Sequence, residues 1–157
     1  MSASAAIALG SNLDSGFGDR AANLREAVRR LEGLGTVKAI SSFFDTEPVG
    51  LIEQPRFINA ALLLETTLGP VELMRGLLET ERTMGRDRTA TAMKGPRVID
   101  LDLLLYGDWV LWSDELILPH PAMGERRFVL EPLAEIAPQW VHPVLGITVR
   151  ELLERLG

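Results

Sequence analysis

The spacing of apolar positions changes along the chain between the two-residue repeat of strands and the longer repeat of helices. Extended apolar stretches predict strands over residues 5–9, 37–44, 57–66 and 109–112, and one in the stretch that ends at Gly107. Helical spacing and capping residues predict helices over residues 20–34, from Pro70 onward, around 126–130 and after Thr148. The second and third strands are expected to pair as a hairpin.

These elements do not follow the steady strand-helix alternation of a parallel, doubly wound sheet. We therefore expect an α+β fold in which helices pack on the faces of a mainly antiparallel sheet. A chain of 157 residues can bury enough surface to fold as one domain, which we expect to span residues 1–157.

Two aspartates interrupt the most apolar stretch of the chain. In an extended strand Asp100 and Asp102 project to the same side, about 6.7 Å apart. Ile99, Leu101, Leu103 and Leu105 are expected on the opposite side. Two like charges so close need a counter-charge, and paired carboxylates suit a hard cation such as Mg²⁺. Salt bridges to Arg97 and Arg88 are the structural alternative.

Charge is distributed unevenly. The net charge of −6 argues against a general nucleic-acid or anionic-membrane surface. Residues 82–97, in contrast, hold five basic residues and one acidic residue, a net charge of +4, and lead directly into the aspartate strand. Arginines beside a carboxylate pair suit the binding of a metal-bound polyphosphate, because guanidinium groups bind phosphate oxygens and the metal neutralises the remaining charge. Residues 86–94, in the middle of this basic stretch, are polar and lie between Gly85 and Gly95. We therefore expect them to form a lid that closes over a nucleotide.

Glu81 is a second unusual carboxylate. At 100° per residue it falls within the apolar face of the predicted second helix, where an unpaired acid is rare. It is expected to contact either a ligand or an internal arginine.

Other sequence features narrow the class of protein. The chain contains no cysteine, which excludes disulfides and thiolate zinc sites, and no apolar run long enough for a membrane span. We expect a soluble, cytoplasmic protein that acts as a monomer. The P-loop pattern is absent, and the glycine-rich residues 16–21 are not followed by a convincing parallel unit, which disfavours a dinucleotide fold.

Six ordered blocks of the sequence resemble the hydroxymethyl-dihydropterin pyrophosphokinase family. They lie at residues 8–13, 46–50, 54–61, 85–88, 95–102 and 118–121. The resemblance implies a ferredoxin-like fold and a step of folate biosynthesis. In that step ATP gives its β,γ-diphosphate to the pterin hydroxymethyl group, and AMP is released.

The resemblance also implies roles for individual residues. Asp100 and Asp102 would hold two Mg²⁺ ions, while Arg86 and Arg97 would neutralise phosphate charge in the transition state. The expected ATP contacts are Leu78, Glu81, Arg88, Arg97, Leu103, His120 and Arg126. The expected pterin contacts are Thr46, Val49, Phe57, Asn59 and Phe128.

Simpler interpretations exist for several of these residues. His120 lies between two prolines and fits a turn residue that bonds to the backbone, and Phe57 and Phe128 fit ordinary core aromatics. Two other functions are also compatible with the fold class: a small-molecule sensing module without catalysis, and a two-metal phosphodiesterase. A sensor would bind its ligand without turnover, and a phosphodiesterase would hydrolyse without a pterin acceptor.

Overall fold

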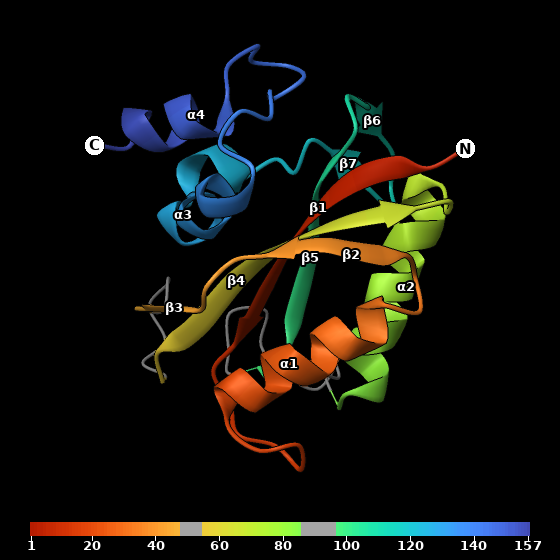
Figure 1. The fold of residues 1–157 in the computed structure, drawn as a ribbon, viewed down its shortest axis with the longest axis vertical. Coiled ribbons are helices and arrows are strands. Elements are labelled where there is room, and N and C mark those ends of the chain that lie inside the picture. Colours follow the sequence, from red (N-terminus) through yellow and green to blue (C-terminus); the bar gives the residue numbers. More distant parts are fainter. Residues whose placement is uncertain (48–54, 86–96) are drawn as a thin grey trace.

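A computed structural model describes residues 1–47, 55–85 and 97–157 (Figure 1). Its strands are β1 (Ala3–Ser11), β2 (Thr36–Ile40), β3 (Phe44–Thr46), β4 (Phe57–Thr66), β5 (Asp100–Tyr106), β6 (Leu111–Trp112) and β7 (Ile117–Leu118). Its helices are α1 (Arg20–Leu31), α2 (Pro70–Thr83), α3 (Arg127–Ile136) and α4 (Val149–Arg155), with a 3-10 helix at Met123–Glu125.

The main sheet has the strand order β2-β4-β1-β5, and β3 also pairs with β4. Each of these pairings is antiparallel. Helices α1 and α2 lie on one side of the sheet, and α3 and α4 lie on the other (Figure 1). This arrangement confirms the predicted antiparallel α+β fold and the predicted pairing of the second and third strands.

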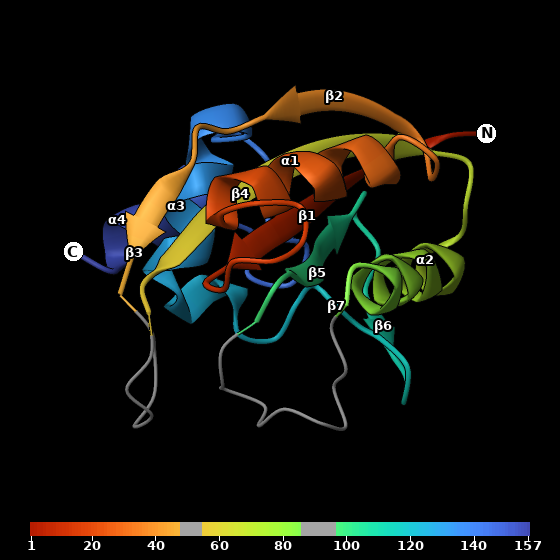
Figure 2. The same ribbon diagram turned by 90° about the horizontal axis from the view of Figure 1, so that it is seen from below.

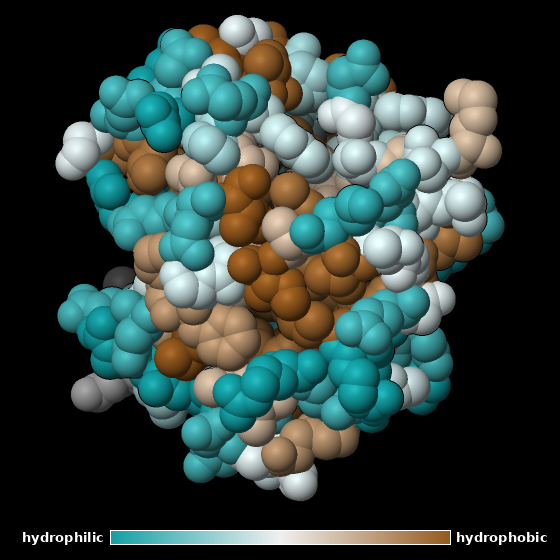
Figure 3. Space-filling view, viewed as in Figure 1, coloured by the Kyte–Doolittle hydropathy of each residue, from teal (hydrophilic) through white to brown (hydrophobic). Residues whose placement is uncertain are grey.

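Alternating side chains of the central strand β1 serve two separate cores. Ile7 and Leu9 are buried with α1 and α2, whereas Ala6 packs in the cluster with α3 and α4. Each fully buried leucine or isoleucine contributes about 1.5–3 kcal/mol of hydrophobic stabilisation. At the β2 edge of the sheet apolar groups reach the surface: Ile40 is 43% exposed, and apolar residues form a band across this face in Figure 3.

The helix starts follow the capping signals of the sequence. Pro70 occupies the first turn of α2, and Thr148 and Glu151 form a capping box at α4. Helix α2 packs along β5, and the β6–β7 hairpin lies beside it (Figure 2), where Arg75 bonds to Glu115 at 2.9 Å. No helix in the described parts of the chain is long and apolar enough to cross a bilayer.

Several boundaries differ from the prediction. The first helix ends at Leu31 instead of residue 34, and the strand predicted over residues 109–112 shortens to Leu111–Trp112. The strand predicted over residues 37–44 is two strands, β2 and β3, because the chain leaves the regular pairing with β4 at residues 41–43. The short helix expected around residues 126–130 extends to Ile136, with Pro132 inside it.

The side assigned to Leu105 was wrong. Ala6 pairs with Leu105 and Ile7 pairs with Leu103, so Leu104 is an extra residue in β5. Such a bulge breaks the strict alternation of side chains. Leu101 and Leu103 therefore pack with α1 and α2 as expected, whereas Leu105 packs with α3 and α4.

Candidate functional site

The two halves of the predicted site lie in one row across the sheet. Gly10 of β1 pairs with Asn59 of β4 on one side and with Asp100 of β5 on the other. Directly paired residues point to the same face of a sheet, and neighbouring strands are about 4.8 Å apart. Asn59 and Asp100 therefore share a face, about 9.6 Å apart across Gly10. Asp102, two residues after Asp100 along β5, points to the same side.

Gly10 keeps the middle of this row open. A Cβ at this position would lie 2.9 Å from Asn59 Oδ1 and 3.7 Å from Phe57 Cδ1. The first distance is shorter than real Cβ atoms show, so a side chain here would displace Asn59. The glycine thus provides space between the amide and the carboxylate.

The aspartate pair is half-buried, and an arginine and a histidine lie beside it. Arg97 Nη1 donates to Asp100 Oδ2 at 3.0 Å, and the two side chains are 15% and 23% exposed. His120 Nε2 lies 3.9 Å from Asp102 Oδ1. The salt bridge from Arg97 that the structural alternative required is therefore present, whereas Arg88 lies outside the described residues.

The orientation of His120 is fixed by its own turn. Its Nδ1 accepts a hydrogen bond from the Ala122 amide at 3.2 Å, which leaves the ring proton on Nε2, the nitrogen that faces Asp102. Burial lowers the pKa of His120; the nearby charge of Arg126 lowers it further, and Asp100 acts in the opposite direction. His120 therefore makes the backbone hydrogen bond expected of a turn residue, and it also lies next to the aspartates.

Arg97 is held through its backbone, while one nitrogen of its side chain has no partner in the part of the chain that the structure describes. The side-chain oxygen of Asn12 accepts from the backbone amide of Arg97 at 2.6 Å. The backbone amide of Asn12 donates to the Arg97 carbonyl at 3.0 Å. Asn12 Nδ2 also donates to the Pro55 carbonyl at 3.0 Å. Arg97 Nε is buried without an acceptor among the described residues, which typically costs about 1–3 kcal/mol. An anionic ligand oxygen would relieve this cost if the guanidinium turned toward it.

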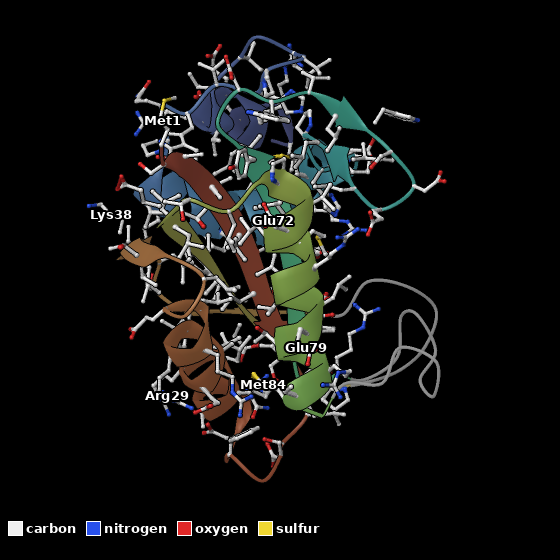
Figure 4. The ribbon with its side chains drawn as sticks, turned by 90° about the vertical axis from the view of Figure 1, so that its right-hand side faces the viewer. Met1, Arg29, Lys38, Glu72, Glu79 and Met84 are labelled. Carbon is white, nitrogen blue, oxygen red and sulfur yellow. The ribbon has the colours of Figure 1, made fainter. Side chains whose placement is uncertain are left out.

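Glu81 contacts β5, the strand that contains the two aspartates, from helix α2. Its side chain is buried, at 2% exposure, and Oε2 accepts from the Leu101 amide at 2.7 Å. Leu101 lies between the two aspartates, so Glu81 supports their backbone. Glu79, by contrast, lies on the outer surface of α2 and pairs with Arg82 (Figure 4).

The leucines expected near ATP differ in exposure. Leu78 is 38% exposed on α2. Leu103 is 1% exposed and packs in the core on the face away from the aspartates. The side chain of Leu103 therefore does not reach the aspartate side, and only its backbone remains for the expected nucleotide contact.

An open cavity of about 210 Å³ lies between β3 and α3. It is lined by Phe44, Thr46, Glu47, Arg127, Phe128, Glu131 and Pro132. Two predicted pterin residues, Thr46 and Phe128, are thus brought together here. Asn59 Nδ2 donates to the Thr46 hydroxyl, and Phe57 pairs directly with Thr46 across β3 and β4, so all four residues are adjoining. Arg126 lies over the Phe128 ring, 5.7 Å from its centre.

Part of the predicted site lies outside the described residues. Val49, Arg86 and Arg88 belong to this part, and so does the lid expected at residues 86–94. Within the described residues, no group of three or more acidic, histidine or cysteine side chains is arranged to hold a metal. Two half-buried carboxylates on one face nevertheless fit the oxygen preference of Mg²⁺, provided that ligand phosphates and water complete the coordination.

Comparisons with known proteins identify similar chains. The family model of 7,8-dihydro-6-hydroxymethylpterin-pyrophosphokinase matches residues 6–138. The 2-amino-4-hydroxy-6-hydroxymethyldihydropteridine pyrophosphokinase of Bacillus subtilis is 44% identical over 135 residues, which cover 85% of this chain and 77% of that protein. The Synechocystis pyrophosphokinase of the same name is 40% identical over 154 residues, or 97% of this chain and 75% of that protein.

Some relatives are much longer. The folic acid synthesis protein FOL1 of Dictyostelium discoideum is 38% identical over 93% of this chain, but the match spans only 21% of that protein. A crystal structure of Plasmodium falciparum HPPK-DHPS superposes with a TM-score of 0.79 at 16% identity. That match covers 99% of this chain and 44% of the other, and it supports the fold alone.

Proposed function

The chain belongs to the 7,8-dihydro-6-hydroxymethylpterin-pyrophosphokinase family, and on this premise we propose the reaction that it catalyses. It transfers the β,γ-diphosphate of ATP to the hydroxymethyl group of hydroxymethyl-dihydropterin and releases AMP, as a step of folate biosynthesis. The family resemblance expected from the six sequence blocks is thereby confirmed. ATP as the donor and Mg²⁺ as the metal are parts of the proposal.

One observation carries the proposal: the row formed by Asn59, Gly10 and Asp100. It joins an amide suited to the edge of a heterocycle with a carboxylate suited to a phosphate-bound metal, and Gly10 between them contributes no side chain. A substrate with a flat ring at one end and a reacting hydroxyl at the other fits such a row. The amide would set the ring, and the hydroxyl would lie toward the carboxylate.

The phosphate side of the site contains the charges that this reaction needs. Asp100 and Asp102 would hold two Mg²⁺ ions, which supply charge neutralisation and lower the pKa of a bound hydroxyl. Arg97 would leave its bond to Asp100 and donate to phosphate oxygens, which would also satisfy its buried Nε. The Nε2–H of His120 is available to hydrogen-bond a phosphate oxygen, and Arg126 adds positive charge beside it.

The pterin side would bind by stacking and hydrogen bonding. Phe57 and Phe128 would offer aromatic faces to the ring, and the amide of Asn59 would pair with its donor and acceptor edge. Thr46 already receives a hydrogen bond from Asn59, so it would hold the amide in one orientation. Specificity for the pterin would come from this pair.

We also propose that the protein acts in the cytoplasm as a monomer, without a nucleic-acid or membrane partner. The net charge of −6 and the absence of cysteine support this setting.

An AMP-release assay tests the proposed function. AMP should appear only when ATP, Mg²⁺ and hydroxymethyl-dihydropterin are all present. Asp100→Ala and Asp102→Ala should each lower turnover about a hundredfold or more, as loss of a transition-state stabiliser does elsewhere. The control Asp108→Ala removes an exposed carboxylate from the turn after β5 and should retain full turnover.

Three results would contradict the proposal. AMP or ADP released without the pterin would favour a phosphodiesterase or another hydrolase. Calorimetric binding of the substrates without any turnover would favour a sensing module. Normal turnover in both aspartate variants would remove the metal assignment.

A further inference from the structure

Residues 41–43 form a joint between β2 and β3. The chain leaves its regular pairing with β4 after Ile40 and resumes it at Phe44. Ser41 fastens the joint to β4: its amide donates to the Ala61 carbonyl, and its hydroxyl accepts from the Ala61 amide, each at 2.9 Å. Because the other side of β3 has no strand partner among the described residues, its position depends on what holds this joint.

Glu135 of α3 holds the opposite side of the joint. Its Oε1 accepts from the Ser42 amide and its Oε2 from the Ser42 hydroxyl, both at 2.6 Å. The bond from the Ser42 hydroxyl has the larger effect on the pKa of Glu135 and the bond from the Ser42 amide the smaller one, and both lower this pKa below its ordinary value. The carboxylate therefore stays charged at neutral pH. Figures 1 and 2 both show the joint passing next to α3.

The same side of α3 forms a wall of the cavity. Glu131 and Pro132 line it, and Glu135 follows them by four and three residues, which places it one helical turn farther on the same side. Phe44, two residues after Ser42, lines the facing wall together with Thr46. The Glu135–Ser42 contact therefore closes one end of the gap between α3 and β3.

We infer that Glu135 is a positioning residue that sets the separation of β3 and α3, and through it the placement of Thr46 and Phe128 around the pterin ring. The inference rests on the proposed function, because it assigns the cavity to the pterin. Glu135 itself is not expected to touch either substrate. It acts through Ser42, so its loss should weaken pterin binding without altering the phosphate side.

The test is a double-mutant cycle at Glu135 and Ser42. Glu135→Ala should raise the KM for the pterin about tenfold, with kcat and the KM for ATP within about twofold of the parent. Ser42→Ala, which removes one of the two bonds, should give a smaller rise. The double variant should be no worse than Glu135→Ala, because both changes break one contact. Glu135→Gln keeps an oxygen acceptor and should restore much of the affinity.

Calorimetric binding of the pterin and thermal melting complete the experiment. Glu154→Ala, which removes an exposed carboxylate from α4, serves as the control and should leave the KM unchanged. An unchanged pterin KM in Glu135→Ala, or equal losses for ATP and pterin, would overturn the inference. If Glu135→Ala does not fold, Ser42→Ala and Glu135→Gln still decide by the same comparison of the two KM values. An inactive parent enzyme would instead refute the proposed function.

Discussion

Replacing Gly10 with alanine should weaken pterin binding and leave the fold in place. The new Cβ would lie 2.9 Å from Asn59 Oδ1, an atom at the end of a side chain and not of the backbone. Gly10 is not one of the residues with a positive φ, so alanine can adopt its backbone conformation. The change therefore acts on the shape of the site.

The expected loss follows from that contact. The Asn59 amide oxygen must move away by a few tenths of an ångström, while the nitrogen of the same amide donates to the Thr46 hydroxyl. An amide turned away from its substrate loses about one to two hydrogen bonds, each worth about 0.5–1.5 kcal/mol net. Two kcal/mol corresponds to a change in affinity of about thirtyfold. We expect the KM for the pterin to rise by about five- to thirtyfold.

The free energy of unfolding should change much less. Alanine loses less conformational freedom on folding than glycine, by roughly 0.5–1 kcal/mol, and this gain offsets the displacement of Asn59. The assay is AMP release at varied pterin and saturating ATP, with urea unfolding measured in parallel. Gly16→Ala is the matched control, because a Cβ at Gly16 would meet no atom within 4 Å.

The outcome separates two explanations. A raised pterin KM with an unchanged ATP KM and near-normal stability supports the cross-strand row as the substrate site. An unchanged pterin KM in a folded Gly10→Ala protein would refute the assignment of Asn59 and Gly10 to the pterin. The same holds if Gly16→Ala has an equal effect.

Two further predictions concern buried polar groups. Glu81→Ala should lower the free energy of unfolding by about 2 kcal/mol or more, because the buried Leu101 amide loses its acceptor. Glu81→Gln keeps an acceptor and should cost less. Equal losses for the two variants in urea unfolding would contradict this prediction. Burial lowers the pKa of His142, whose Nδ1 accepts from the Val144 and Leu145 amides. The folded protein thus resists binding this proton, so stability should be complete above the unfolded pKa of about 6.5 and fall as pH drops below it. His142→Asn keeps an acceptor that does not titrate and should flatten this decline between about pH 7 and pH 5; identical slopes in both proteins would contradict the assignment.

The sequence contains enough information to predict which residues are chemically unusual. Asp100 and Asp102 stand out because charges are costly in an apolar strand, and Glu81 because it falls on an apolar helix face. The fold class also follows, since the order of strands and helices excludes a regular parallel sheet. These inferences depend only on residue type and local spacing.

Long-range register was not predictable in the same way. Nothing in the local spacing indicates that Asn59 and Asp100 pair with the same residue, Gly10, because that depends on how three separate strands align. The bulge at Leu104 is a similar case. One extra residue changes the side of Leu105, while the apolar pattern of the segment is the same with or without it.

The polar residues that hold the site were missed for a different physical reason. Asn12 binds the backbone of Arg97 and Pro55, and Glu135 binds the amide of Ser42. Glu81 was recognised as unusual, but its backbone partner, Leu101, was not. Backbone groups are identical at nearly every position, so a side chain that bonds to one leaves no complementary residue type in the sequence. The Asp100–Arg97 pair, by contrast, has two recognisable partners three residues apart.

This difference has a consequence for mutational analysis. Residues that touch the substrates are found from their chemistry, and their loss should affect kcat or one KM directly. Residues such as Glu135 act through a backbone whose position they determine, so their effect depends on the partner that remains. A single substitution cannot distinguish this from general destabilisation, whereas non-additivity with Ser42 and a separation of the two KM values can. The supporting network should therefore be mapped by paired substitutions.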